Sequence, residues 1–320
     1  MKDTILYGDC RDTLSTLNDK VQMCVTSPPY YGMRNYGDET NQIGHEDTPE
    51  EYIQNLVKVF QSVKNVLADD GTLWLNMGDS YYNYRPGKGQ ALVKQTVANS
   101  KQDLPDKCAR RGNKLEGLKE KDLIGIPWML AFALRADGWY LRQDIIWHKP
   151  NPMPESVKDR CTKSHEYLFL LSKNKRYYYN NEAIKEPAKD WGTRDRTNGK
   201  YHNKGTGLQP HSGLTKSYPT KNKRSVWSIT NKPYRGSHFA VFPPDLIEPC
   251  IKAGSEEGDC VLDPFMGSGT TAMVAKSLGR DYIGCELHED YGNLIQQRVE
   301  EYEPVQEVAQ ESTVNILDLI

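Results

Sequence analysis

A glycine-rich turn near residue 267 has a pattern that brings the polypeptide backbone close to a small ligand. The apolar run VLDPF is followed by the turn MGSG, the helix-forming stretch TTAMVAKSLG and a second apolar run, YIGCE. Gly267 and Gly269 tolerate backbone conformations that other residues avoid, and they leave room for a close approach. Glu286, at the end of the second run, is placed to accept hydrogen bonds from the two hydroxyls of a ribose. The expected chemistry is therefore the binding of a nucleoside by a strand, turn, helix and strand in succession.

The same turn lacks the features of a dinucleotide site. The three-glycine fingerprint is incomplete, and no basic residue stands where a pyrophosphate would need one. This pattern favours a nucleoside without phosphates, and therefore S-adenosylmethionine over a nicotinamide cofactor. Taken alone, the glycines are also compatible with a plain tight turn, and Glu286 with a solvated strand end. Their joint spacing favours a binding site.

A second candidate site follows the apolar run VQMCVT, where the chain continues as Ser27, Pro28, Pro29 and Tyr30. The two prolines fix two backbone φ angles and remove two hydrogen-bond donors, so the neighbouring oxygen acceptors are held rigidly. By itself this tetrapeptide is compatible with a proline-rich turn, but beside the glycine turn it favours a catalytic loop. Asp9 ends a shorter apolar run, where its carboxylate either accepts from an adenine amine or caps a turn, and both interpretations stay open.

Together, TSPPYYG (26–32) and DPFMGSGTT (263–271) resemble the motifs of the amino-methyltransferase family of DNA-modifying enzymes. The similarity extends through IIWHKPNPMPESVKDR to HEYLFLLSK (145–173) and through HFAVFP (238–243). It covers most of the chain outside its polar and basic stretches and its C-terminal tail. The catalytic motif precedes the cofactor motif, an order that resembles the circularly permuted group called the beta class.

The resemblance implies a DNA methyltransferase that uses S-adenosylmethionine. The implied fold is Rossmann-like α/β, with a seven-stranded, mostly parallel sheet flanked by helices and a basic inserted recognition region. The expected catalytic residues are Ser27, Pro28, Pro29 and Tyr30. The expected cofactor-binding residues are Asp9, His238, Phe239, Asp263, Pro264, Phe265, Gly267, Gly269, Thr270 and Glu286. No metal site is expected, because the seven cysteines are scattered and no pair has C-x-x-C spacing.

The implied reaction is direct methyl transfer to an exocyclic amino group of a base. Such an amine is a poor nucleophile because its lone pair is delocalised into the ring. Fixed acceptors for its two N–H bonds, here the Ser27 hydroxyl and the Pro28 carbonyl, let the nitrogen pyramidalise toward the methyl group. The base must leave its duplex, which costs about a few kcal/mol, and stacking on Tyr30 offsets ~1–3 kcal/mol. No covalent intermediate is needed, so Cys10 and Cys24 should be dispensable.

The first residue of the tetrapeptide bears on the choice of base. Family members with Ser there are mostly associated with cytosine, and those with Asp or Asn mostly with adenine. Ser27 therefore favours N4 of cytosine, and N6 of adenine is the alternative. Weaker alternatives are an RNA or protein-amide methyltransferase, whose tetrapeptide typically begins with Asn in the glutamine methyltransferases, and a catalytically silent DNA-binding homologue. The silent homologue is disfavoured because nothing structural requires both motifs together.

Helices and strands alternate along the chain, which predicts an α/β sheet, either parallel or mixed. Thr48, Pro49 and Glu51 supply an N-cap, a first-turn proline and a capping-box acid for a helix that Gly71 is expected to end. Further helices are expected at 126–139, 245–254 and 267–279, and strands at 4–9, 21–30, 71–79, 140–149, 165–173, 258–265 and 281–287.

Charge is segregated along the chain, although the formal net charge is only −2. Residues 186–235 hold 11 Lys or Arg against 3 Asp or Glu, a net charge of +8 that suits phosphate contacts with double-stranded DNA. A solvated flexible linker is the alternative. We therefore expect a catalytic part at 1–185, a target-recognition region at 186–235, a cofactor-binding part at 236–303 and a tail at 304–320. The polar stretch 80–122 is expected to be a long loop or insertion.

The chain has no apolar run that approaches the roughly 18 to 20 residues of a membrane helix. Its first residues, MKDTILYGDCRD, lack the apolar stretch of a signal peptide. A cytoplasmic protein without membrane association is therefore expected. Both a monomer and a dimer are compatible with the sequence.

Overall fold

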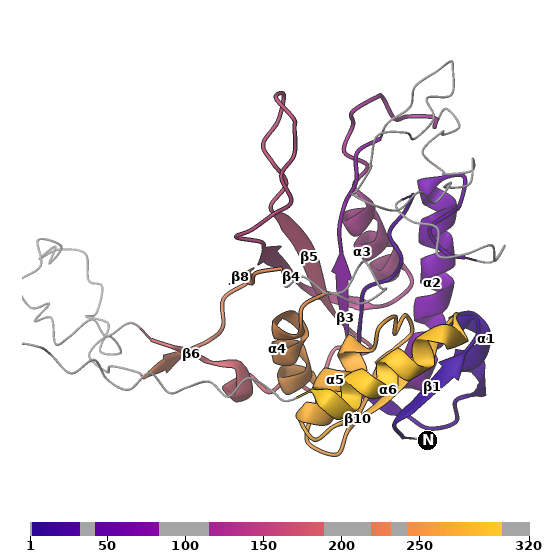
Figure 1. Ribbon diagram of the computed structural model, residues 1–320, viewed down its shortest axis with the longest axis vertical. Coiled ribbons are helices and arrows are strands. Elements are labelled where there is room, and N and C mark those ends of the chain that lie inside the picture. The colour runs from indigo at the N-terminus through magenta and orange to yellow at the C-terminus, as the bar shows by residue number, and fades with distance from the viewer. Residues whose placement is uncertain (1, 33–41, 83–114, 189–218, 232–241, 303–320) are drawn as a thin grey trace, which may run out of the picture.

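One large sheet organises the protein. The computed structural model describes residues 2–32, 42–82, 115–188, 219–231 and 242–302 (Figure 1). Within these residues, eight strands pair in the order β1-β10-β9-β2-β3-β5-β4-β8. Their bounds are β1 (Thr4–Tyr7), β2 (Val21–Thr26), β3 (Leu67–Met77), β4 (Tyr140–His148), β5 (His165–Ser172), β8 (Val226–Ser228), β9 (Cys260–Asp263) and β10 (Asp281–Glu286). In this sheet β5 runs antiparallel to both neighbours, and the other pairings are parallel.

Helices cover both faces of the sheet (Figure 1). The described α-helices are α1 (Cys10–Thr13), α2 (Pro49–Val66), α3 (Ile126–Ala136), α4 (Pro244–Gly254), α5 (Thr270–Ser277) and α6 (Gly292–Glu301). Side chains of α1, α2 and α3 share one buried cluster with Leu73 and Leu75 of β3. Side chains of α4, α5 and α6 share a second cluster with Trp74, whose neighbours in the strand face the other way. The result is a three-layer α/β fold with a mostly parallel sheet, which confirms the predicted fold class.

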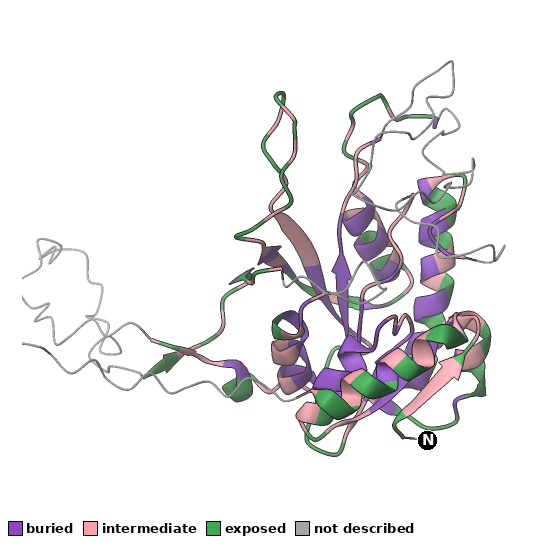
Figure 2. Cartoon of the chain, viewed as in Figure 1, coloured by how far each residue is buried: buried purple, intermediate pink, exposed green. Residues whose placement is uncertain are grey.

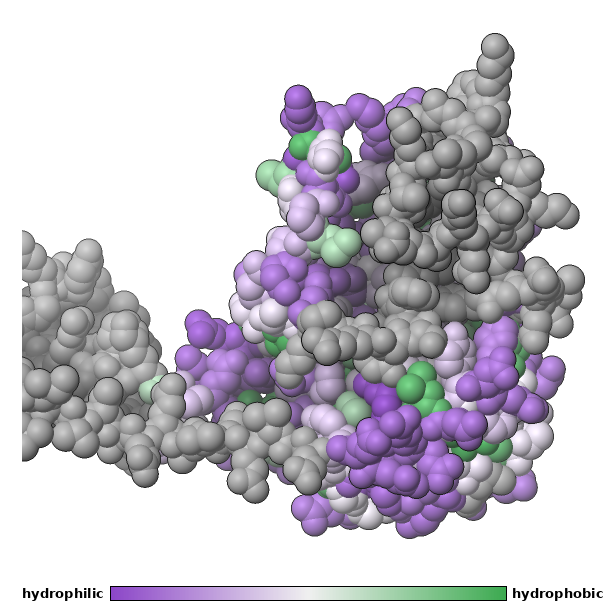
Figure 3. All heavy atoms as spheres, viewed as in Figure 1, coloured by the Kyte–Doolittle hydropathy of each residue, from purple (hydrophilic) through white to green (hydrophobic). Residues whose placement is uncertain are grey.

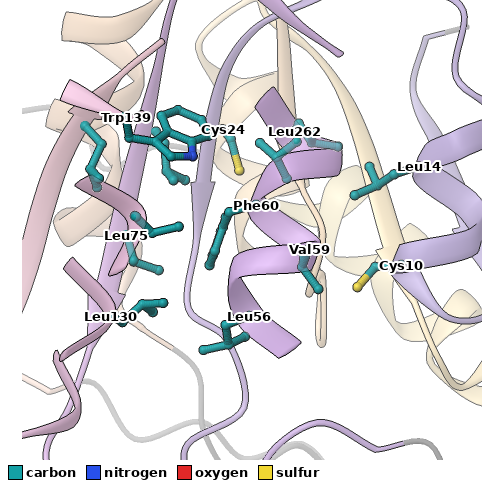
Figure 4. Packing of buried hydrophobic residues seen from close by; sticks show 14 of the residues in the cluster. Cys10, Leu14, Cys24, Leu56, Val59, Phe60, Leu75, Leu130, Trp139 and Leu262 are labelled. Atoms are coloured by element: carbon teal, nitrogen blue, oxygen red, sulfur yellow. The ribbon is translucent and has the colours of Figure 1, made fainter. Parts of the chain in front are cut away.

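The start of α2 follows the predicted capping pattern. The Thr48 side chain accepts a hydrogen bond from the Glu51 amide at 3.2 Å, and Pro49 is the first helical residue. The buried side of the helix then carries Leu56, Val59 and Phe60 against the sheet (Figure 4). A regular apolar stripe on a capped helix therefore fixes how α2 packs.

The predicted end of this helix is wrong. The helix stops at Val66, and β3 begins at Leu67 and continues through Gly71. A Cβ atom on Gly71 would lie 2.9 Å from the carbonyl oxygen of Gln22, the second residue of β2. Glycine at this position therefore allows two neighbouring strands to approach, and it does not end a helix.

The large sheet has one strand more than the seven that were expected. All seven expected strands are present, and β8 adds an eighth from within the region 186–235. It pairs in parallel with β4, and the Trp227 side chain is buried in the second core cluster. Two further short strands, β6 (Glu186–Pro187) and β7 (Thr220–Lys221), pair with each other. A three-residue strand held by one large aromatic side chain gives too weak a pattern to be recognised from sequence.

Burial follows the layers of the fold. Buried residues concentrate in the strands and on the sides of the helices that face them (Figure 2). Among the helices of the described residues, none is long and apolar enough to cross a bilayer.

Phe60→Ala should lower the free energy of unfolding by about 3–5 kcal/mol, because it leaves a cavity between α2 and the sheet. Lys58→Ala, on the exposed side of the same helix, is the control and should change it by less than about 0.5 kcal/mol. Urea unfolding of the two variants measures the difference. Equal effects would show that the packing of this helix contributes little to stability.

Candidate active site

The two sequence motifs lie side by side at one edge of the sheet. The segment Ser27–Tyr30 follows β2, and the glycine turn follows β9. These strands are parallel neighbours, with Cys24 opposite Leu262, so their carboxyl ends meet at the same edge. Ligands of open α/β sheets bind at this edge. More than 230 positions of sequence therefore separate groups that the sheet brings together.

A buried carboxylate joins the two motifs. Asp263 is 1% exposed and accepts hydrogen bonds from the Thr26 hydroxyl at 2.6 Å, the Thr271 hydroxyl at 2.5 Å and the Phe265 amide at 3.0 Å. Burial raises the pKa of Asp263 to about 6 despite these three bonds. Both oxygens of this carboxylate thus accept from protein donors, and its part in cofactor binding stays a prediction.

Glu286 holds the glycine turn in place. Its carboxylate accepts from the Gly267 amide at 2.7 Å and from the His288 amide at 3.1 Å. The side chain is mostly buried, and burial raises its pKa. The acid at the end of β10 thus lies against the backbone after β9. Its contact with ribose hydroxyls stays a prediction.

The end of the turn combines a packing requirement with an unused hydroxyl. Gly269 has φ +82°, and a Cβ atom there would lie 2.8 Å from Cγ2 of Ile295 in α6. The glycine is therefore needed for helix packing, whatever else the turn binds. The next residue, Thr270, has a buried hydroxyl without a hydrogen-bond partner in the structure as described. A buried polar group of this kind fits a site that is completed by a ligand.

A side chain of α2 anchors the proline loop. The hydroxyl of Tyr52, a fully buried side chain, donates a hydrogen bond of 2.7 Å to the Pro29 carbonyl. At the start of the loop, the Ser27 hydroxyl lies 3.5 Å from the Tyr30 hydroxyl. A loop with two fixed φ angles and an anchored carbonyl presents its remaining acceptors in one orientation.

Three polar residues that sequence reasoning did not place in the site form a hydrogen-bonded group with Tyr30. The Tyr30 hydroxyl donates to Glu166 at 2.8 Å, and Asn76 donates to the same carboxylate at 3.3 Å. Lys149 forms an ion pair with the other oxygen of Glu166. Asn76 and Glu166 lie within two residues of an observed strand end, and Lys149 directly follows β4. The expected strands at 71–79, 140–149 and 165–173 were the signal that could have pointed to them.

The remaining predicted residues lie at the same edge of the sheet or outside the described residues. Asp9 caps α1 by accepting from the Arg11 amide at 2.8 Å and pairs with the Arg11 guanidinium. Burial acts to raise the pKa of Asp9, but the bonds from Arg11 outweigh it and hold the pKa below its usual value. The capping alternative is thus what the structure has, and a contact with adenine stays a prediction. His238 and Phe239 lie outside the described residues. Pro264 and Phe265 follow β9, with Phe265 packed on the core.

No cysteine nucleophile or metal cluster emerges from the described residues. Cys10 and Cys24 are buried, and burial raises the pKa of both thiols, which disfavours the reactive thiolate. Groups of three or more His, Cys, Asp or Glu side chains suited to a metal are absent from the part of the chain that the structure describes. The groups that meet at the edge are therefore hydrogen-bonding ones.

The family model described as DNA methylase, for N6 and N4 methyltransferases, matches residues 21–297. This chain belongs to that family. The DNA methylase is 47% identical over 301 residues to the Type II methyltransferase M.SmaI of Serratia marcescens, covering 92% of this chain and 90% of the relative. It is 45% identical over 298 residues to M.XycI of Xanthomonas campestris pv. cyanopsidis, covering 93% and 87%. The enzyme is therefore a DNA methyltransferase of the N6/N4 family.

Solved structures share the fold of this DNA methylase. The PvuII DNA methyltransferase, cytosine-N4-specific, aligns with a TM-score of 0.62 at 17% identity, covering 95% of this chain and 88% of that one. The complex of M1.HpyAVI with SAM aligns with a TM-score of 0.52 at 18% identity, covering 92% and 98%. At these identities the likeness shows the arrangement of the sheet and its helices.

The raised pKa of Asp263 predicts a pH-dependent stability. Between about pH 4 and about pH 6 the folded protein keeps a proton that the unfolded chain has lost, so the free energy of unfolding falls as pH rises through this window. Asp263→Asn cannot titrate. Its stability relative to the wild type should therefore rise by about 3 kcal/mol from about pH 4 to about pH 7.

Urea unfolding of both proteins at several pH values measures this difference, because other titrating groups cancel between them. Asp12→Asn, at an acid outside the core, is the matched control and should leave the difference flat. A flat profile for Asp263→Asn would contradict the raised pKa.

Proposed function

We propose that this DNA methyltransferase transfers the methyl group of S-adenosylmethionine to N4 of a cytosine that has been swung out of double-stranded DNA. The observation that carries the proposal is the position of Ser27. It is the first residue of the proline loop, and this loop lies directly beside the glycine turn. Ser at this position favours cytosine in the family that the chain resembles. The PvuII enzyme, described as cytosine-N4-specific, has this fold and supports the assignment at the level of architecture.

The residues around the glycine turn fit the cofactor. Glu286 lies against the turn and is the candidate acceptor for ribose hydroxyls, and the buried Thr270 hydroxyl offers an unused donor and acceptor. Gly267 and Gly269 keep the backbone of the turn free of side chains. When bound, S-adenosylmethionine supplies an electrophilic methyl group on a sulfonium centre. A relative of the same fold is described as a complex with SAM, which supports this choice of donor.

The loop residues prepare the amine of the base. The Ser27 oxygen and the Pro28 carbonyl accept its two N–H bonds, which directs the nitrogen lone pair out of the ring plane. Tyr52 engages the Pro29 carbonyl, so the loop presents the Pro28 carbonyl to the substrate. The tyrosine ring of the motif, Tyr30, stacks on the base and offsets part of the unstacking cost. The new N–C bond forms as the S–C bond breaks, and the electron pair of the broken bond leaves with sulfur as S-adenosylhomocysteine. The methylated nitrogen then loses a proton to solvent water.

N6 of adenine is the second candidate. The family model spans both N6 and N4 methyltransferases. A hydroxyl and a carbonyl accept equally well from either exocyclic amine. Methylation of RNA or of a protein amide, and a silent DNA-binding role, stand further back because the chain keeps both complete motifs and its matched relatives are Type II methyltransferases. Partnership with a restriction nuclease is proposed on the same grounds.

The region 186–235 remains the proposed site of DNA recognition. Its described ends are residues 186–188 and 219–231. There Lys221, Lys223 and Arg224 lie 3.5–3.9 Å from the Glu186 carboxylate, so one acid holds three basic side chains together. Clustered basic side chains suit a phosphate backbone.

Purified enzyme incubated with unmethylated DNA and labelled S-adenosylmethionine should yield N4-methylcytosine after digestion to nucleosides. Mass spectrometry identifies the product. N6-methyladenine instead would keep the fold and mechanism and overturn the choice of base. The absence of any methylated nucleoside, with cofactor binding shown by calorimetry, would point to an RNA or protein substrate.

Ser27→Ala should lower kcat about tenfold to a hundredfold, because one acceptor for the amine is lost. Calorimetry should show unchanged cofactor affinity. Ser15→Ala is the matched control, since the Ser15 hydroxyl bonds only its own helical turn among the described contacts. Normal turnover of Ser27→Ala would exclude the proposed hydrogen bond.

A further inference from the structure

We propose that Glu166, paired with Lys149, is a positioning residue for methyl transfer: it fixes the Tyr30 ring and sets the direction of the hydrogen bond that the Ser27 hydroxyl makes. This inference rests on the proposed function, because Glu166 would act through Tyr30 and Ser27, whose roles in methyl transfer are themselves proposed. Glu166 lies at the start of β5 and Lys149 directly after β4, two strands that the catalytic motif does not include.

The contacts of Glu166 leave little freedom to its carboxylate. One oxygen accepts from the Tyr30 hydroxyl at 2.8 Å and from the Asn76 amide at 3.3 Å. The other oxygen is paired with Lys149. The Glu166 and Lys149 side chains are 15% and 17% exposed, so solvent screens this pair far less than a surface pair. The carboxylate is thus a fixed acceptor at the edge of the sheet.

Lys149 is itself held in place. Its backbone amide donates to the Ser164 carbonyl at 2.7 Å, and its ammonium group lies 4.2 Å from the centroid of the Trp147 ring. The cation therefore has a fixed position, and the carboxylate that it pairs with is fixed in turn. From Lys149 and Ser164 the chain between β4 and β5 projects beyond the sheet as a narrow hairpin, and its surface is mostly hydrophilic (Figures 1 and 3).

The chemistry of a carboxylate decides the direction of donation. An ionised Glu166 can only accept a hydrogen bond, so the Tyr30 hydroxyl must donate to it, and the Tyr30 oxygen is then left as an acceptor. The Ser27 hydroxyl, 3.5 Å away, can donate to that oxygen and turn its own lone pairs elsewhere. Burial and the Glu166 charge raise the pKa of Tyr30, which keeps its hydroxyl protonated. Ser27 is thereby presented as an acceptor, which is what an amine of a base requires.

The backbone of Gly78 fixes the ring from another side. A Cβ atom on Gly78 would lie 2.7 Å from Cε2 of Tyr30 and 3.3 Å from Cδ of Glu166. Only glycine therefore lets the ring lie against the end of β3 while its hydroxyl reaches Glu166. Because the ring is held both at its edge and at its hydroxyl, a base that stacks on it meets a surface that is already in place.

The first experiment measures kcat and KM for DNA and cofactor affinity in Glu166→Gln, Tyr30→Phe and the double variant. Each single variant should lower kcat about tenfold to a hundredfold and leave cofactor affinity unchanged within about twofold. The double variant should be no slower than Tyr30→Phe, because Glu166 acts through the Tyr30 hydroxyl. Glu155→Gln is the matched control: Glu155 is paired with Arg160 in the hairpin, and its loss should leave kcat unchanged.

Normal turnover of Glu166→Gln, or losses that multiply in the double variant, would overturn the inference. A wild-type enzyme that methylates no DNA would overturn the proposed function and the inference with it, so the two failures are distinguishable. Lys149→Arg keeps the pair and should retain kcat, whereas Lys149→Met should lower it.

Two further variants separate positioning from folding. Glu166→Gln leaves Lys149 without its partner, and thermal unfolding will show whether stability suffers. The neutral combination Glu166→Gln with Lys149→Met removes that charge and should still be slow. Gly78→Ala displaces the ring without changing any charge and should also lower kcat with unchanged cofactor affinity. Full activity of folded Gly78→Ala would contradict the fixed-ring account.

Discussion

The hydrogen bond from Thr26 to Asp263 connects the two parts of the candidate active site. Thr26 is the last residue of β2 and precedes the catalytic loop, whereas Asp263 ends β9 and precedes the glycine turn. The same carboxylate accepts from Thr271 in α5, so strand, loop and helix share one buried acceptor. An unpaired polar group in such a place would be strongly unfavourable, so the three partners hold one another in register. In the proposed reaction, the distance between methyl donor and base therefore depends on a contact that touches neither.

The direction of β5 explains why the site gathers groups from so many parts of the chain. The parallel strands bring their carboxyl ends to one edge. Ser27 directly follows β2, Asn76 is the last residue but one of β3, and Lys149 directly follows β4. Because β5 is antiparallel to its neighbours, it contributes its amino end, with Glu166 opposite Trp147. A parallel strand in its place would have carried that glutamate to the opposite edge of the sheet.

Sequence reasoning succeeds where the determining contacts are local. The cap at Thr48 and the spacing from the glycine turn to Glu286 are both readable within short windows, and the structure has them. It fails where a partner comes from elsewhere: Gly71 resembles a helix stop but is needed because Gln22 approaches from β2. The pair of Glu166 with Lys149 falls in the second class. Its members are 17 positions apart in ordinary charged segments, and only the pairing of β4 with β5 brings them together.

Strand β8 connects the proposed recognition region to β4. The Trp147 indole donates to the Ile229 carbonyl at 2.9 Å. The Asn151 side-chain amide donates to the Asn231 carbonyl and accepts from the Asn231 backbone amide. Residues 229 and 231 are thus bonded to the chain on either side of Lys149, at Trp147 in β4 and at Asn151 after it. The Lys149 ammonium lies over the Trp147 ring and is paired with Glu166. A displacement of β8 that moved Trp147 would therefore also disturb this ion pair. The segment proposed to read DNA therefore pairs with the strand that carries Trp147, and the Trp147 ring contacts the ammonium group that is paired with Glu166.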